Sequence, residues 1–117
     1  MKKSQIIGRK GEDFAVACLE KNQFQIVARN WRHKHCELDI IAIKNDVVHF
    51  VEVKTLRSLK FGFPECKITR EKFCHMSTAA DEYLRQQNIF QRIQFDVFSV
   101  HIQKKKIEFL FIPDVYF

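Results

Sequence analysis

The sequence predicts an α/β domain in which helices flank one mixed five-stranded sheet. Two segments carry apolar residues at helical spacing, five shorter segments are rich in β-branched and aromatic residues, and their order along the chain is α-β-β-β-α-β-β. The chain has 117 residues, of which 46% are hydrophobic, and we expect a single domain over residues 1–117.

The first predicted helix covers residues 6–22. Its apolar side chains recur at helical spacing, at Ile7, Phe14, Ala15, Cys18 and Leu19. Residues 24–31, FQIVARNW, have the composition of a first strand. Residues 38–43 and 47–53 follow as the second and third strands, separated only by residues 44–46.

The second predicted helix begins after Thr69, a suitable N-cap, and runs to about residue 87. Ile68 and Phe73 fit a hydrophobic staple around this cap. The apolar face of this helix consists of Phe73, Met76, Ala80, Tyr83 and Leu84. The last two strands cover residues 93–102 and 107–112, joined by a basic turn.

Acidic residues interrupt the second and third strands, which otherwise have the apolar composition of buried strands. A two-residue turn at 45–46 joins these strands as a hairpin, because Asn and Asp tolerate the positive φ that such turns need. This hairpin places Asp39 directly opposite Glu52, and Glu37 opposite Lys54. Directly opposed residues have Cβ atoms about 4.5–5.5 Å apart, so the carboxylates of Asp39 and Glu52 would lie close together.

Two carboxylates about 4 Å apart repel by roughly 4 kcal/mol at an effective dielectric of 20, so a cation should relieve the pair. Lys54 offsets part of this repulsion, and Mg²⁺ or Mn²⁺ would take oxygen ligands from both Asp39 and Glu52. The alternative is a solvated salt-bridge face, because a single E-x-K is common by chance. Glu12, on the apolar side of the first helix, is either a fourth member of this group or an acid favoured by the helix dipole.

The pattern D-x(12)-E-x-K on a hairpin, after a helix that carries a Glu, resembles the PD-(D/E)xK restriction-endonuclease-like superfamily. The whole chain is more closely similar to the uncharacterised bacterial YraN-like family, and its G-x-x-G-E start is similar to archaeal Holliday-junction resolvases. The matching stretches are GRKGE (8–12), ARNWR (28–32), ELDII (37–41), FVEVKT (50–55), FGFPE (61–65), Thr69 with Lys72, FDV (95–97) and IPDVYF (112–117).

This resemblance implies a restriction-endonuclease-like fold and metal-dependent hydrolysis of phosphodiester bonds in DNA. It makes Asp39 and Glu52 metal ligands, with the Val53 carbonyl as a third. It makes Glu12 a further ligand or the residue that holds a metal-bound water. Lys54 would orient or activate the attacking water and stabilise charge on the phosphate.

The chain departs from the family pattern at three places. Cys36 stands where the family usually has Gly, Leu38 replaces the Pro of the superfamily's name, and Leu56 replaces a frequent Arg. None of these changes removes a metal ligand. Cys36 and Leu56 put contacts with the substrate in doubt more than the chemistry.

The segment after the third strand is a secondary candidate, because it interleaves basic and aromatic residues. Arg57 and Lys60 would hold a phosphate backbone and Phe61 would stack on an unpaired base, although Phe61 equally fits a core position at the end of the sheet. Lys72 lies in the first turn of the second helix, where the helix dipole gives a lysine no advantage, and this favours a functional role. Asp96 fits a structural role, either in strand pairing or beside a basic partner.

Composition limits the partners and the location. Twenty Lys and Arg against 14 Asp and Glu give a net charge of +6, which favours a polyanionic partner. Neither a secretory signal nor a membrane span is evident, so we expect a cytoplasmic protein with reduced cysteines. The HKHC run at 33–36 invites a zinc site but has no matching ligand pair, and we expect ordinary side chains there and no organic cofactor.

Three functions compete at this stage. The first is a Mg²⁺- or Mn²⁺-dependent nuclease acting on DNA, including branched or damaged DNA, as an endonuclease or exonuclease. The second is a nucleic-acid-binding module that keeps the fold without cleaving, and the third is a protein-interaction scaffold with a purely structural site. The intact set Asp39, Glu52 and Lys54 favours catalysis. A homodimer would suit a junction or a duplex.

Overall fold

The computed structural model describes residues 3–56 and 68–116 and confirms the predicted order of elements. The elements are α1 (Lys3–Lys21), β1 (Gln25–His33), β2 (Cys36–Lys44), β3 (Val47–Leu56), α2 (Arg70–Gln87), β4 (Arg92–Ile102) and β5 (Ile107–Ile112). The sheet has the strand order β1-β2-β3-β4-β5. β3 and β4 run parallel and the other neighbours antiparallel, so the predicted mixed sheet is confirmed.

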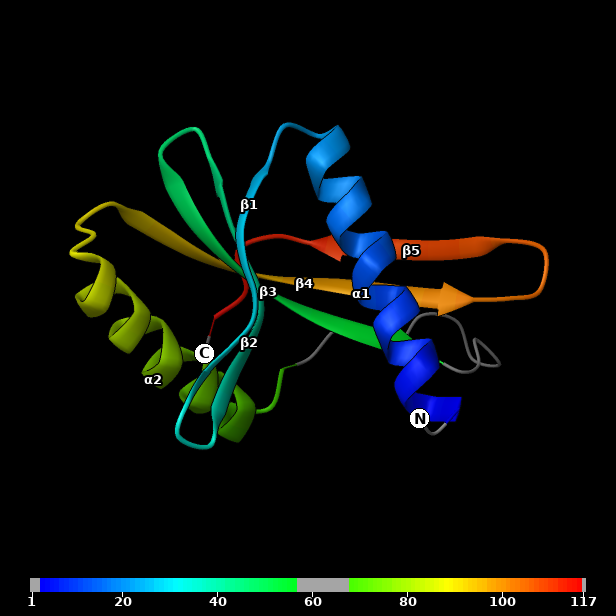
Figure 1. Cartoon of the computed structure of the whole chain (residues 1–117), viewed down its shortest axis with the longest axis horizontal. Helices are drawn as coiled ribbons and strands as arrows, with labels where there is room; N and C mark the ends of the chain where they lie inside the picture. Colours follow the sequence, from blue (N-terminus) through cyan, green and yellow to red (C-terminus); the bar gives the residue numbers. More distant parts are fainter. Residues whose placement is uncertain (1–2, 57–67, 117) are drawn as a thin grey trace.

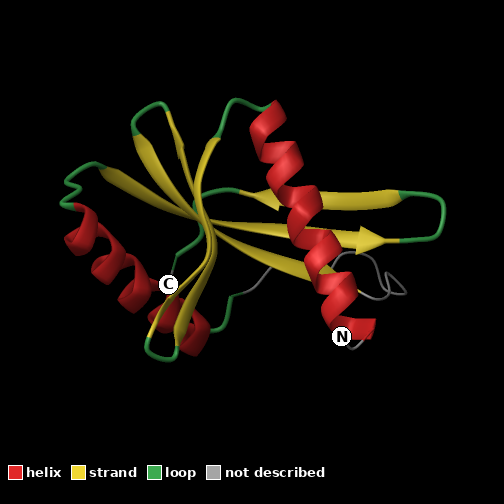
Figure 2. Ribbon diagram, in the orientation of Figure 1, coloured by secondary structure: helices red, strands yellow, loops and turns green. Residues whose placement is uncertain are grey.

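The two helices cover opposite faces of the sheet, each over its own apolar cluster (Figures 1 and 2). Ala15 of α1 packs in one cluster with Val51, and Met76 of α2 packs in the other with Phe50. Successive residues of β3 therefore point to different helices, as the alternation in its sequence predicts. Neither helix of the described residues is apolar over the length that crossing a membrane requires.

Local sequence signals account for the ends of α2 and for the first hairpin. The Thr69 hydroxyl accepts a hydrogen bond from the Lys72 N–H at 3.1 Å, which confirms the predicted N-cap. Asn88 ends the helix in a left-handed conformation with φ of 55°. Asn45 and Asp46 have φ of 52° and 63°, the values that a two-residue turn between antiparallel strands needs.

Gly11 allows α1 to approach β3 closely. A Cβ at this position would lie 2.2 Å from Oγ1 and 3.2 Å from Cβ of Thr55, so a larger residue would force the helix away from the sheet. Gly8, one turn earlier, has nothing within 4 Å of such a Cβ. The second glycine of the G-x-x-G-E start therefore fixes the distance between α1 and the sheet, and with it the position of Glu12.

Candidate metal centre

The pairing of β1, β2 and β3 is interrupted at Asn30 and Asp39. β1 pairs with β2 on both sides of this level, but Asn30 and Asp39 themselves do not pair. Asn30 has φ of 52°, a left-handed conformation that Asn tolerates better than most residues. The pairing of β2 with β3 also ends here, at Ile40 with Val51, and the two strands diverge beyond it (Figure 1).

Asp39 and Glu52 therefore do not form the predicted cross-strand pair. The strands β2 and β3 pair as predicted from Lys44 with Val47 to Ile40 with Val51, but this pairing does not continue to Asp39 and Glu52. Instead the Asp39 carboxylate accepts a hydrogen bond from the Val53 N–H at 2.9 Å, and it lies within hydrogen-bonding reach of the Glu52 carboxyl. Glu37 lies beside Arg32 of β1, at 3.5 Å, and not in a ladder pair with Lys54.

Burial makes this carboxyl pair unusual. Glu52 is only 8% exposed and Asp39 is half-buried. Burial is the largest cause that raises the pKa of Asp39 to about 7, followed by its hydrogen bond with Glu52 and the charge of Glu52. The Val53 N–H and the charge of Lys72 act in the opposite direction. Asp39 therefore keeps its proton at pH values well above those at which an exposed aspartate loses it.

Two lysines belong to the same side of the sheet. The Lys72 ammonium lies 3.2 Å from Oε2 of Glu52, so the structure brings this predicted residue to the acids. Burial lowers the pKa of Lys72, but the charge of Glu52, its hydrogen bond and the charges of Asp39 and Glu37 outweigh burial and raise it. Lys54 lies two residues beyond Glu52 on β3, level with Ser99 of β4.

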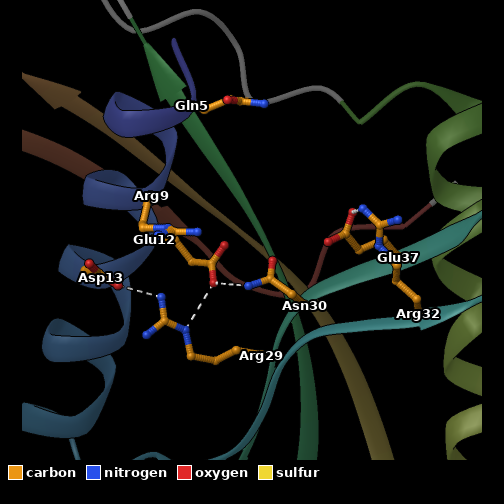
Figure 3. A pocket seen from close by; sticks show the side chains of 8 residues that line it. All are labelled: Gln5, Arg9, Glu12, Asp13, Arg29, Asn30, Arg32 and Glu37. Carbon is orange, nitrogen blue, oxygen red and sulfur yellow. Dashed lines mark hydrogen bonds and ion pairs between the residues drawn. The ribbon is translucent and has the colours of Figure 1, made fainter. Parts of the chain in front are cut away.

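Glu12 contacts β1 from the α1 side of the sheet. Its Oε1 accepts hydrogen bonds from Nε of Arg29 at 3.0 Å and from Nδ2 of Asn30 at 2.9 Å (Figure 3). Nη2 of Arg29 also binds Oδ1 of Asp13 at 2.6 Å. The irregular backbone at Asn30 turns its amide toward α1, and this holds Glu12 at the level of the strand interruption. The role of Glu12 as a metal ligand stays a prediction.

A polar pocket of about 740 Å³ opens between α1 and the β1–β2 hairpin. Its lining residues are Gln5, Arg9, Glu12, Asp13, Arg29, Asn30, Arg32 and Glu37 (Figure 3). Arg9, Arg29, Arg32 and Asn30 of this pocket are not among the predicted site residues. The run ARNWR contained a signal, because an Asn inside a predicted strand tolerates the left-handed conformation that a local change of backbone direction requires. Glu37 lines the pocket and also acts electrostatically on Lys72, so the pocket adjoins the carboxyl pair.

Three predicted nucleic-acid contacts, Arg57, Lys60 and Phe61, lie outside the described residues. Asp96 is fully buried, and its structural role is borne out. Its carboxylate binds Nδ1 of His49 at 2.7 Å and Nε2 of Gln94 at 2.8 Å, and accepts the Asp114 N–H at 2.9 Å. These contacts link β3, β4 and the segment after β5.

The donor set at Asp39 and Glu52 fits a hard divalent ion that keeps much of its water. Within residues 3–56 and 68–116, no group of three or more His, Cys, Asp or Glu side chains is arranged to hold a metal, so neither the HKHC run nor Glu12 together with Asp39 and Glu52 forms one. Mg²⁺ is commonly bound by one or two carboxylates together with water and substrate phosphate oxygens. The two carboxylates of Asp39 and Glu52 meet this requirement, whereas a closed zinc site would need four protein ligands; the Val53 carbonyl as a third ligand stays a prediction.

Residues 11–100 match the sequence profile of an uncharacterised protein family, UPF0102. A UPF0102 protein of Clostridium perfringens is 38% identical over 120 residues, covering 99% of this chain and 98% of its own. UPF0102 proteins of Bacteroides fragilis and Caldicellulosiruptor saccharolyticus are 39% and 41% identical over 100 residues each, covering 86% and 85% of this chain and 83% and 85% of their own. The chain belongs to the UPF0102 family, and the predicted resemblance to YraN-like proteins is confirmed.

Proposed function

We propose that this member of the UPF0102 family is a nuclease that hydrolyses phosphodiester bonds in DNA with Mg²⁺ or Mn²⁺ held by Asp39 and Glu52. The observation that carries the proposal is the buried contact between these two carboxyls at the interruption of the sheet. Folding gains nothing from placing two acids together in a buried position. Their arrangement is therefore best explained by a cation that binds there during function.

Each residue of the centre would have its own role in the reaction. The Val53 N–H fixes the Asp39 carboxylate, and Asp39 and Glu52 would hold the ion, with Glu12 available from α1. A bound Mg²⁺ would lower the pKa of a water ligand and neutralise charge on the phosphate. Lys54, on the same side of β3 as Glu52, would orient the attacking water and stabilise the developing negative charge.

A polyanionic substrate agrees with the charge of the chain and with the pocket. The net charge is +6, and two of the acids, Asp39 and Glu52, belong to the centre itself, so the rest of the surface is more basic still. Arg9 and Arg32 line the pocket beside the centre, with the Arg32 side chain 74% exposed. Arg57, Lys60, Phe61 and Lys72 remain proposed contacts with the nucleic acid.

One observation favours the second candidate, a nucleic-acid-binding module that does not cleave. The Lys72 ammonium already neutralises Glu52 at 3.2 Å and so competes with a metal ion for this ligand. In a nuclease, Lys72 would turn from Glu52 to the phosphate when the ion binds. In a non-cleaving module, Lys72 would stay with Glu52 and the pair would serve only the structure.

The test is a cleavage and binding panel on single-stranded, duplex, flap and four-way-junction DNA and on RNA, with Mg²⁺, Mn²⁺ or EDTA. The variants are Asp39→Asn and Lys54→Met, with Asp81→Asn as the matched control because Asp81 is an exposed carboxylate of α2. A nuclease requires metal-dependent cutting that both site variants lose and Asp81→Asn keeps. Salt-dependent binding without cutting would support the nucleic-acid-binding module. A protein that neither binds nor cuts, and that takes up no Mn²⁺, would support the protein-interaction scaffold.

A further inference from the structure

The two edges of the sheet differ in how they are protected against pairing with another chain. β1, at one edge, carries Arg29 and Arg32 and is made irregular by a register shift between Ile26 and Ala28 and by the left-handed Asn30. Charges and irregularities of this kind are the usual protection of an exposed strand. β5, at the other edge, has the sequence IEFLFI and pairs with β4 without interruption from Ile107 to Ile112.

The apolar residues of β5 are exposed on both sides of the strand. Ile107, Phe109 and Leu110 are 41%, 49% and 40% exposed. Phe109 packs against Phe14 and Phe98 on the α1 side, and Leu110 points to the other side of the sheet. Among the described residues, no strand pairs with the outer edge of β5, which lies with β4 at the end of the molecule remote from α2 (Figure 1).

We propose that β5 pairs with β5 of a second copy of this chain, in antiparallel orientation, to form a continuous ten-stranded sheet. A two-fold axis normal to the sheet requires that one residue faces itself, because only then do the hydrogen-bonding positions and the side-chain directions of both strands agree. The centre of the apolar run offers two such residues, Phe109 and Leu110. Either register brings the exposed apolar side chains of both copies together.

The charges at the two ends of β5 favour a second copy over an unrelated partner. The turn before the strand carries Lys104, Lys105 and Lys106, all exposed, and Asp114 follows the strand and is also exposed. With Phe109 facing itself, Asp114 of the second copy falls opposite Lys104. With Leu110 facing itself, it falls opposite Lys106. The charge of Glu108 within the strand is balanced by Lys106 at 2.9 Å.

This pairing has a consequence for the centre, which rests on the proposed function. A two-fold axis normal to the sheet keeps the α2 side of both copies on the same face. β3 is the third strand from the new junction in each copy, so the two β3 strands would lie about 24 Å apart. Two centres on one face at this distance would reach both strands of one nucleic acid.

The test is sedimentation velocity and equilibrium of the full chain from micromolar to millimolar concentration, in EDTA and without nucleic acid. The disrupting variant is Leu110→Lys, and the matched control is Val27→Lys, because Val27 lies on the other edge strand and is 37% exposed. We expect the wild type and Val27→Lys to dimerise reversibly and Leu110→Lys to dimerise at least about tenfold more weakly. Thermal melting by circular dichroism identifies any variant that does not fold.

A second variant, Lys104→Glu, changes the charge of the exposed turn without altering the strand. With Phe109 facing itself, this change should weaken the dimer and reduce the loss of affinity that salt causes in the wild type, because Lys104 then lies opposite Asp114; with Leu110 facing itself, Lys106→Glu should do the same. A wild type that stays monomeric at millimolar concentration would overturn the proposal. A dimer that Val27→Lys disrupts as strongly as Leu110→Lys would also overturn it. Since neither result depends on cleavage, both are separate from a failure of the proposed nuclease activity.

Discussion

Replacing Asp39 by Asn should stabilise the metal-free protein at neutral and alkaline pH. The pKa of Asp39 rises from 3.8 to about 7 in the folded state, first through burial and then through Glu52. A shift of this size corresponds to roughly 4 kcal/mol. The amide keeps an oxygen for the Val53 N–H but accepts a weaker hydrogen bond than a carboxylate, which offsets about 1–2 kcal/mol. The expected net gain is about 2 kcal/mol.

The direction in which pH changes the stability follows from the protons bound by the folded and unfolded states. Between about pH 4 and pH 7 the folded protein holds a proton on Asp39 that the unfolded chain releases, so the free energy of unfolding of the wild type falls as pH rises through this range. Asp39→Asn lacks this dependence. The difference between variant and wild type should therefore grow from pH 4 to pH 7 and level off above, as measured by urea unfolding in EDTA.

Added Mg²⁺ tests whether Asp39 binds a metal ion, and Asp81→Asn serves as the matched control. At pH 8 an excess of Mg²⁺ should stabilise the wild type, by about 2.7 kcal/mol at 100 times the dissociation constant, and should leave Asp39→Asn unchanged. Asp81→Asn removes an exposed carboxylate of α2 and should track the wild type at every pH. A difference between Asp39→Asn and wild type that stays constant from pH 4 to pH 8, or a less stable variant at pH 8, would refute the argument.

Three further predictions concern stability and are measured by thermal or urea unfolding. Gly11→Ala should lower the free energy of unfolding by about 1–3 kcal/mol, because the added Cβ meets Thr55. Gly8→Ala, with open space around it, should raise the free energy of unfolding by up to about 1 kcal/mol through helix propensity. Equal effects of the two changes would show that α1 does not approach β3 at Gly11. Asp96→Ala should cost about 3 kcal/mol, since it leaves the buried His49 without its partner, and a loss below 1 kcal/mol would contradict the network. Thr69→Ala should cost about 1 kcal/mol and Thr69→Ser much less, and equal losses would exclude the N-cap.

The elements of the fold follow from local signals, and this is why the sequence predicts them well. Thr69 caps α2, the turn at 45–46 has the residues that a positive φ requires, and each strand alternates between two apolar clusters. Such signals act over a few residues. The predicted pairing of β2 with β3 accordingly holds from the turn as far as Ile40 and Val51.

The arrangement at the centre depends on contacts between distant segments, which periodicity does not encode. Asn30 leaves its strand pair in a left-handed conformation, and Asp39 beside it binds the Val53 N–H with its side chain in place of a ladder contact. A count of residues from the turn assumes an unbroken ladder and so misses both. The place of Lys72 in the first turn of α2 predicts a functional role for it, but its contact with Glu52 depends on how α2 packs against the sheet.

Side chains of both helices contact the sheet near its interruption. From α1, Glu12 is held by the Asn30 amide, and from α2, Lys72 reaches Glu52. A sheet built only for stability would complete its strand pairs there, because an unpaired strand residue and a buried carboxyl pair both raise the free energy of the folded state. The stabilisation expected of Asp39→Asn is the direct measure of that cost. If the variant gains stability and loses Mg²⁺ binding together, the same two carboxyls account for both, and the interruption serves the bound ion.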